Sequence, residues 1–395
     1  MKPVASVDYT RLAKIDTLIN SYIKKGWEKG MVTLIVKDNK IVQYKGYGFL
    51  DTAMKKSMPN DAIFRIMSQT KAITSVAIML LYEDGKFLLD EPIADFIPEF
   101  RSPVELDKFN ATDTTFTTTP AKRDITFRDL LTHTSGIDYA GIGSNEMKAI
   151  YAKAGIPSGL GHSSMTLLDA IKILAKQPLK FQPGAQWQYG LSTDVLGCLV
   201  EVISGQTLEN FFQSRIFEPL GMKDSYFNVP ASKASRLATV YTEDDKRNII
   251  PWSHTFRNLD PDYPIMGTTF FSGGAGLSST AYDYAIFLQM LLNKGRYNGK
   301  QLLAPRTVEL MLSGQLDFMF NGTNNFGLGF ELVSDKAAAR NGRNKGSFAW
   351  GGYYGTTYWA DPKANMVCLI MTQHNPNSHG DLTARIENLI YSSLK

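Results

Sequence analysis

The strand patterns of this chain lie near its two ends, and the residues between them have mainly helical and loop patterns. Near the start, apolar runs at 31–36 and 41–47 flank Asp38-Asn39, which predicts a hairpin, and a third strand is expected at 62–66. Near the end, three more strands are predicted, at 347–350, 356–360 and 366–372. We therefore expect both ends of the chain to contribute to one antiparallel sheet with helices packed on it.

This order of elements predicts an α/β (α+β) protein with an inserted, mainly helical part. We expect the sheet domain to comprise residues 1–85 and 271–395, and the helical domain to comprise residues 86–270. Helical periodicity at 9–27 and 281–292 provides helices for the sheet. An active site is expected where the two domains meet.

The composition excludes some classes of function but does not identify the function. The chain has 395 residues and a net charge of +4, with its Lys and Arg residues scattered, so no nucleic acid or membrane surface is expected as a partner. Cys198 and Cys368 lie far apart in apolar runs and are expected to be buried free thiols. No apolar run approaches the ~20 residues that span a bilayer. The start lacks the apolar segment of a signal peptide, which predicts a cytoplasmic protein unless such a segment was removed.

Ser68 lies where the strand run at 62–66 changes into a helical pattern, and it forms an S-x-x-K pair with Lys71. Apolar residues recur at helical spacing from Ile73 to Leu81, which predicts an amphipathic helix that ends before Gly85. Residues three apart on a helix share a face, so the Lys71 amine is expected beside the Ser68 hydroxyl. A serine nucleophile needs such a base, and the helix start offers N–H groups to an oxyanion.

The same four-residue spacing recurs at Ser21-Lys24 and at Ser392-Lys395. The first copy lies in a basic helix pattern that reads as a solvated face, and the second is the end of the sequence. Ser68 is therefore the candidate nucleophile, and the alternative is a serine that only caps a helix.

Other chemistries lack their motifs in this sequence. It contains no G-x-S-x-G, H-E-x-x-H, C-x-x-C or phosphate-binding loop, so no metal and no cofactor is expected. The five histidines are dispersed, and His133 is expected to be structural, bonding the backbone of its loop. The other four are His162, His254, His374 and His379.

Two more stretches complete a recognisable set with Ser68-Lys71. One is 187–192, which contains Tyr189, and the other is 348–353, which contains Trp350-Gly351-Gly352. Together the three resemble the serine β-lactamase and penicillin-binding protein superfamily, and most closely its class C-like family VIII carboxylesterases. The resemblance covers nearly the whole chain from Ile15 and implies a β-lactamase/transpeptidase-like fold.

The resemblance also implies roles for residues at matching positions. Ser68 would be the acylated nucleophile, Lys71 would keep it activated, and Tyr189 would relay the proton. It leaves open whether Lys71 or Tyr189 is the general base. The backbone N–H groups of Ser68 and Tyr353 would form the oxyanion hole.

Two departures from the family pattern concern the substrate. Trp350 replaces the lysine of Lys-Thr-Gly, with Gly351 and Gly352 after it, and Leu191 replaces the asparagine of Tyr-x-Asn. Both changes make the expected substrate pocket more apolar and less charged. They favour neutral, small-molecule esters with short acyl groups over β-lactams or D-Ala-D-Ala peptides.

The leading hypothesis is therefore a serine carboxylic-ester hydrolase. The alternatives within the superfamily are a β-lactamase, a D-amino-acid amidohydrolase or peptidase, and an acyltransferase. A non-catalytic binding protein of the same fold is a further alternative, since fold does not determine function. The sequence does not indicate the oligomeric state.

Overall fold

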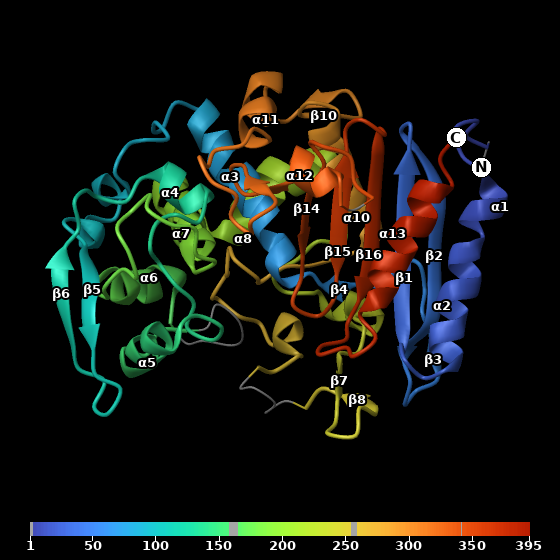
Figure 1. The fold of residues 1–395 in the computed structure, drawn as a ribbon, viewed down its shortest axis with the longest axis horizontal. Coiled ribbons are helices and arrows are strands. Elements are labelled where there is room, and N and C mark those ends of the chain that lie inside the picture. The colour runs from blue at the N-terminus through green and yellow to red at the C-terminus, as the bar shows by residue number, and fades with distance from the viewer. Residues whose placement is uncertain (1–2, 158–164, 254–258, 341) are drawn as a thin grey trace.

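The fold is that of a computed structural model, which describes residues 3–157, 165–253, 259–340 and 342–395 (Figure 1). Within these ranges, eight strands form one antiparallel sheet in which strands from both ends of the chain lie side by side. The order is β12 (Asn325–Phe326), β13 (Glu331–Leu332), β14 (Phe348–Gly351), β15 (Thr357–Asp361), β16 (Met366–Thr372), β1 (Gly30–Lys37), β2 (Lys40–Asp51) and β3 (Lys56–Ser57). The expected shared sheet is confirmed.

The N-terminal hairpin provides an inner strand of this sheet. Every residue of β1 is buried, because the strand is paired on both edges and covered on both faces. Asp38 and Asn39 join β1 to β2 with positive φ angles of 52° and 59°. A two-residue hairpin turn of this kind requires that backbone geometry, which Asp and Asn tolerate better than most residues. The predicted hairpin is thus confirmed.

Helices cover both faces of the sheet (Figure 1). On one face, α1 (Tyr9–Leu12), α2 (Lys14–Lys24) and α13 (Asp381–Ser392) pack in one apolar cluster with residues of β1 and β16. On the other face, α10 (Ala281–Leu292) packs against β1, β15 and β16. The single helix expected at 9–27 is wrong in one respect, since Ala13 separates α1 from α2.

The helix after Ser68 differs from the expected amphipathic helix. In α3 (Thr70–Glu83), every residue from Thr70 to Leu81 is buried, so the helix is enclosed on all sides. It packs against α7 (Ser192–Ser204), and its polar residues find partners inside the protein. The hydroxyl of Thr74 donates to the Gly273 carbonyl at 2.6 Å. The chain leaves α3 at Gly85 with a positive φ of 70°, as expected for a residue just past a helix end.

The other elements surround this core. The remaining helices are α4 (Phe127–Leu131), α5 (Asn145–Lys153), α6 (Leu167–Ala175), α8 (Leu208–Phe212), α9 (Glu218–Leu220), α11 (Pro305–Met311) and α12 (Asp335–Ala338). In the described part of the chain, four strand pairs lie outside the large sheet: β4 (Phe64–Arg65) with β9 (Ser278–Ser279), β5 (Val104–Phe109) with β6 (Phe116–Pro120), β7 (Tyr241–Glu243) with β8 (Ile249–Pro251), and β10 (Arg296–Tyr297) with β11 (Lys300–Gln301).

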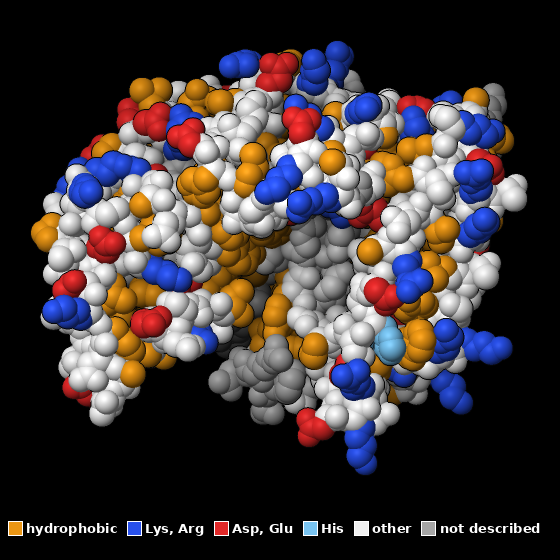
Figure 2. Space-filling model, in the orientation of Figure 1, with side chains coloured by type: hydrophobic (Ala, Val, Ile, Leu, Met, Phe, Trp, Pro, Cys, Tyr) orange, Lys and Arg blue, Asp and Glu red, His pale blue; other side chains and the backbone are white. Residues whose placement is uncertain are grey.

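The face in Figure 2 is hollowed between the part that carries α5, α6 and α7 and the part that carries the sheet, with hydrophobic side chains along the hollow. The domain limits at 1–85, 86–270 and 271–395 stay a prediction. Cys198 and Cys368 are buried and free, as predicted. Among the described residues, no helix is long and apolar enough to cross a membrane.

Candidate active site

Ser68 lies on a tight turn between a short strand and the buried helix α3. The strand β4 ends at Arg65, and a single 3₁₀ turn, η1 (Met67–Gln69), leads directly into α3. Met67 adopts a positive φ of 50°, a conformation that L-residues rarely take and that surrounding structure must hold. The turn is held from both sides: the Ile66 N–H donates to Leu277, and the Leu277 N–H donates to Thr70. Ser68 therefore has a fixed position at the start of the helix.

Lys71 and Tyr189 both reach the Ser68 hydroxyl. The Tyr189 hydroxyl lies 2.6 Å from Ser68 Oγ, and Lys71 Nζ lies 3.4 Å from the same atom. Lys71 Nζ also lies 4.6 Å from the centre of the Tyr189 ring. The structure thus brings together the three residues that the sequence selected, and this arrangement meets the geometric requirement for an activated nucleophile.

The Lys71 ammonium has two shorter contacts that hold it beside Ser68. It donates to the Tyr139 hydroxyl at 2.9 Å and to the Gly274 carbonyl at 2.8 Å. Burial raises the pKa of Tyr139 well above its usual value, so Tyr139 remains a neutral phenol. Tyr139 lies near Tyr189 because the chain packs very closely there: a Cβ on Gly190 would come 2.0 Å from the Ile137 carbonyl oxygen.

A buried carboxylate supports the loop that contacts Lys71. Asp194, in the first turn of α7, accepts hydrogen bonds from the Ser272 hydroxyl at 2.6 Å and from the Gly274 N–H at 3.2 Å. Both bonds go to Oδ1, and Oδ2 has no hydrogen-bond partner among the described residues. Burial raises the pKa of Asp194, whereas the Lys71 charge lowers it. Asp194 thus orients the Gly274 carbonyl toward the lysine.

His133 lies behind these groups and does not reach Ser68 through any bond among the described residues. Its imidazole packs against the rings of Trp187, Tyr189 and Phe326, at centre distances of 5.2 to 5.8 Å. Burial, and then the Lys71 charge, lower the pKa of His133 to about 3, so it is neutral at physiological pH. The backbone N–H of His133 donates to the Leu130 carbonyl, whereas its Nδ1, which was expected to bond the loop backbone, has no hydrogen-bond partner among the described residues.

The end of strand β14 approaches the Ser68 turn. Trp350 is half-buried, and its ring centre lies 5.5 Å from that of Tyr189. A Cβ on Gly352 would come 2.4 Å from the Ile66 carbonyl oxygen, so the strand end and the turn are in direct backbone contact. Gly351 has more space, since a Cβ there would lie 3.4 Å from the Thr356 carbonyl oxygen. This contact places Tyr353 next to the Ser68 turn.

The geometry can now be compared with known proteins. The profile of the Beta-lactamase family matches residues 15–391, and the nucleophile, lysine and tyrosine described above lie within that match. The chain belongs to the beta-lactamase family. The predicted membership of the serine β-lactamase and penicillin-binding protein superfamily, on its family VIII esterase branch, is confirmed, and so is the predicted serine hydrolase.

This beta-lactamase family member is similar along most of its length to three known proteins. Protein Rv1367c of Mycobacterium tuberculosis is 34% identical over 374 residues, which cover 91% of this chain and 90% of that protein. Esterase EstB of Burkholderia gladioli is 28% identical, with 98% of this chain and 97% of that protein covered. The solved structure of EstCE1, a hydrolase with promiscuous acyltransferase activity, superposes with a TM-score of 0.84 at 27% identity, covering 97% of this chain and 99% of that chain.

Leu191 is the one sequence-selected site residue that the structure places in the core. It is only 3% exposed and packs in the large apolar cluster, so it offers little surface to a substrate. The roles assigned to Ser68, Lys71, Tyr189 and Tyr353 remain predictions, because geometry alone does not test them. His162 and His254 lie outside the described residues. Among the described residues, no group of three or more His, Cys, Asp and Glu side chains could hold a metal ion.

Tyr139 and Asp194 are the residues that sequence reasoning missed in this family member. Tyr139 follows the stretch 130–136, which contains His133, by only three residues. That proximity was an available signal, but a lone tyrosine in a segment without periodicity is more often a core residue. Asp194 could be explained as an acidic residue near a helix start, where its negative charge interacts favourably with the helix dipole. Neither residue has a spacing motif that links it to Lys71.

Proposed function

We propose that this protein hydrolyses carboxylic esters with short acyl groups through an acyl-enzyme on Ser68. The observation that carries the proposal is the hydrogen-bond contact of 2.6 Å between the hydroxyls of Tyr189 and Ser68, with Lys71 Nζ 3.4 Å from Ser68 Oγ. A serine with two titratable neighbours this close has a route for its proton, as nucleophilic catalysis requires. The esterase named among the relatives supports the same reaction class.

The reaction has two half-reactions. In the first, Ser68 Oγ forms a bond to the ester carbonyl carbon, and the serine proton passes through the Lys71 and Tyr189 pair to the leaving alkoxide. The bond from that carbon to the alcohol oxygen breaks, and the alcohol leaves. In the second, water attacks the acyl-serine, the same pair passes a proton back to Ser68 Oγ, and the carboxylic acid leaves.

The oxyanion formed in both steps needs backbone donors. We assign this role to the N–H groups of Ser68 and Tyr353. The close contact between Gly352 and Ile66 supports the assignment, since Tyr353 directly follows Gly352 and Ser68 lies only two residues after Ile66. One such donor contributes on the order of 10²–10³ in rate.

The substrate class follows from the side chains near the nucleophile. Trp350 occupies the position at which the family resemblance places a lysine, and its half-buried indole packs on Tyr189. An indole cannot pair with the carboxylate of a β-lactam or a peptide, but it makes apolar contact with a neutral ester. We therefore favour neutral, small-molecule esters over β-lactams.

The test compares p-nitrophenyl butyrate with nitrocefin by turnover and intact mass. We expect butyrate turnover, a butyryl adduct on the wild-type protein, and little nitrocefin turnover. Ser68→Ala should lose the turnover and the adduct, and Tyr189→Phe should lower kcat by about 10²-fold or more. The matched control is Ser21→Ala, because Ser21 has the same S-x-x-K spacing but its hydroxyl donates to the Leu18 carbonyl within α2.

Either of two results would count against the proposal. Efficient nitrocefin turnover that depends on Ser68 would assign the protein to the β-lactamase alternative. Absence of both turnover and adduct, in a protein that is folded by circular dichroism, would favour the non-catalytic alternative.

A further inference from the structure

Aromatic side chains form a continuous wall that includes the proposed proton donor, Tyr189. The wall consists of Tyr189, Trp187, Phe320, Phe326 and Trp350. The ring of Trp187 is nearly parallel to that of Tyr189, with an interplanar angle of 14° and centres 6.1 Å apart. Phe320 follows at 4.7 Å from Trp187, and Phe326 lies 5.4 Å from Phe320 and 5.6 Å from Trp350. Such an array is typical of a surface that binds flat apolar groups.

The wall is accessible at its outer end. Trp187, Phe320 and Trp350 are half-buried, whereas Phe326 is almost fully buried and supports them from behind. The two residues before Phe320 continue the apolar surface outward: Phe318 is 39% exposed and Met319 is 42% exposed. Consecutive exposed large apolar residues that adjoin an aromatic cluster in contact with Tyr189 indicate a binding surface.

The contact between the wall and Tyr189 indicates which half of an ester the wall would bind. Under the proposed function, Tyr189 passes a proton to the leaving alkoxide, so the alcohol oxygen must lie within hydrogen-bond reach of the Tyr189 hydroxyl. The group attached to that oxygen then extends along Trp187, which stacks on Tyr189, and on to Phe320, which packs on Trp187. The acyl group, which stays on Ser68, lies on the other side of the reacting carbon.

We propose that this aromatic wall is a subsite for the alcohol half of the substrate, and that the preferred substrates pair a short acyl group with a large, flat, apolar alcohol. The inference rests on the proposed esterase function and adds the class of the alcohol. Aryl-methyl and fused-ring alcohols have the required chemistry, because they can stack on Trp187 and Phe320 without offering a charge.

The experiment uses three esters: methyl butyrate, 2-naphthylmethyl butyrate and methyl 3-(2-naphthyl)propanoate. The second ester carries the naphthyl group on the alcohol and the third carries it on the acid. We expect the wild-type kcat/KM to be at least tenfold higher for 2-naphthylmethyl butyrate than for either other ester. Phe320→Ala should remove about tenfold of that preference, whereas Phe320→Leu, which keeps most of the apolar volume, should remove less.

Measuring deacylation separately from kcat/KM distinguishes the loss of a subsite from general damage to the enzyme. Methyl butyrate and 2-naphthylmethyl butyrate form the same butyryl-enzyme, so the deacylation rate in single-turnover experiments should be equal for both, and unchanged in Phe320→Ala. In Phe320→Ala, the kcat/KM for methyl butyrate should fall less than the kcat/KM for 2-naphthylmethyl butyrate. The control is Phe116→Ala on β6, because Phe116 is a surface phenylalanine, 39% exposed, that lies outside the wall.

A binding measurement keeps this inference distinct from the function itself. In Ser68→Ala, 2-naphthylmethanol should quench tryptophan fluorescence in a saturable way, and Phe320→Ala added to that variant should weaken the binding about tenfold. Equal losses for all three esters in Phe320→Ala, or preference for the ester with a naphthyl acid, would overturn the subsite. Saturable binding of the alcohol without turnover of any ester would refute the esterase proposal and leave only a site for aromatic molecules.

Discussion

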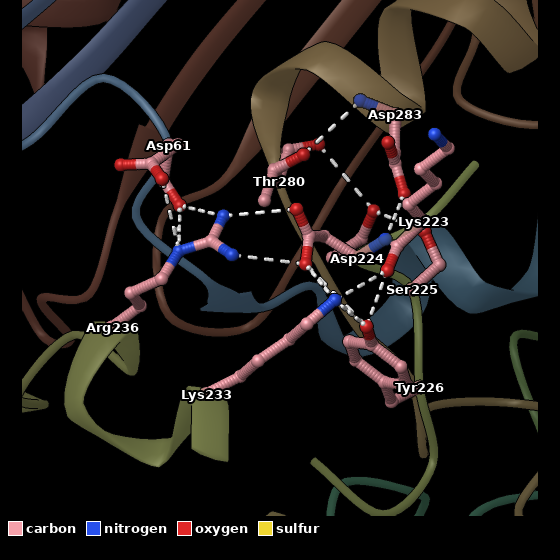
Figure 3. Close-up of polar contacts among 10 residues, drawn as sticks. Asp61, Lys223, Asp224, Ser225, Tyr226, Lys233, Arg236, Thr280 and Asp283 are labelled. Carbon is pink, nitrogen blue, oxygen red and sulfur yellow. Dashed lines mark hydrogen bonds and ion pairs between the residues drawn. The ribbon is translucent and has the colours of Figure 1, made fainter. Parts of the chain in front are cut away.

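Asp283 offers a direct test of how burial changes stability in this protein. Its carboxylate, in the first turn of α10, is 3% exposed, and it accepts hydrogen bonds from the Asp224 N–H at 2.6 Å and the Ser225 hydroxyl at 3.0 Å (Figure 3). Burial raises the pKa of Asp283 to about 6 from its usual 3.8, despite those two hydrogen bonds. The charge of the Asp224 carboxylate also raises the pKa of Asp283, and Lys233 and Arg236 pair with Asp224.

The magnitude follows from linkage between protonation and folding. A pKa raised by about 2 units makes the ionised group cost about 3 kcal/mol of folding free energy at neutral pH. The folded protein binds this proton more tightly than the unfolded chain does. The contribution of protonated Asp283 to the free energy of unfolding is therefore fully present below pH ~4, and it is lost as pH rises through ~6. Asp283→Asn keeps an acceptor oxygen and removes the charge. We therefore expect it to raise the free energy of unfolding at pH 8 by about 1 to 3 kcal/mol, and by almost nothing at pH 4.

Urea unfolding followed by tryptophan fluorescence at several pH values between 4 and 8 measures the difference. Asp381→Asn is the control, since Asp381 lies exposed in the first turn of α13 and Arg385 holds the pKa of Asp381 below its usual value. That control should be less stable than wild type at pH 8, which is the opposite sign. A less stable Asp283→Asn at pH 8, or a gain that does not depend on pH, would refute the reasoning.

Three further substitutions test the active site with p-nitrophenyl butyrate. Tyr139→Phe removes one acceptor of the Lys71 ammonium and should lower kcat at least tenfold with little change in KM, because a hydrogen bond to a charged group contributes about 1.5 to 3 kcal/mol. Asp194→Asn should also lower kcat but not the free energy of unfolding, since it removes a buried charge; a lower urea midpoint would contradict this. Gly352→Ala should lower kcat/KM at least tenfold because its Cβ would come 2.4 Å from a carbonyl oxygen, whereas Gly351→Ala, with its nearest neighbour at 3.4 Å, should retain activity; equal effects would refute the argument.

Much of the fold could be predicted because its elements have local signals. The three C-terminal strands and α10 lie within a residue or two of their predicted limits, since strand alternation and helical periodicity are local properties. The hairpin turn at Asp38 and Asn39 was equally clear. Ser68 and Lys71 could be selected because their spacing on one helix face is also local.

What could not be predicted depends on contacts between distant segments. The complete burial of α3 was missed because Thr70 and Thr74 look like a solvent face, yet they bond to Leu277 and Gly273, about two hundred residues away. The same holds for Tyr139, whose role depends on the close packing of Gly190 against Ile137. No spacing in the sequence relates such pairs.

The pairing of β1 with β16 has a consequence for synthesis on the ribosome. β1 ends at Lys37 and β16 begins at Met366, so about 330 residues must be made before β1 gains this neighbour. At a synthesis rate of about 5–20 residues per second, one edge of β1 stays unpaired for tens of seconds, although every residue of β1 is buried in the folded protein. A nascent chain that already contains the nucleophile therefore cannot complete its sheet, and it depends on being shielded from other chains until the last strand emerges.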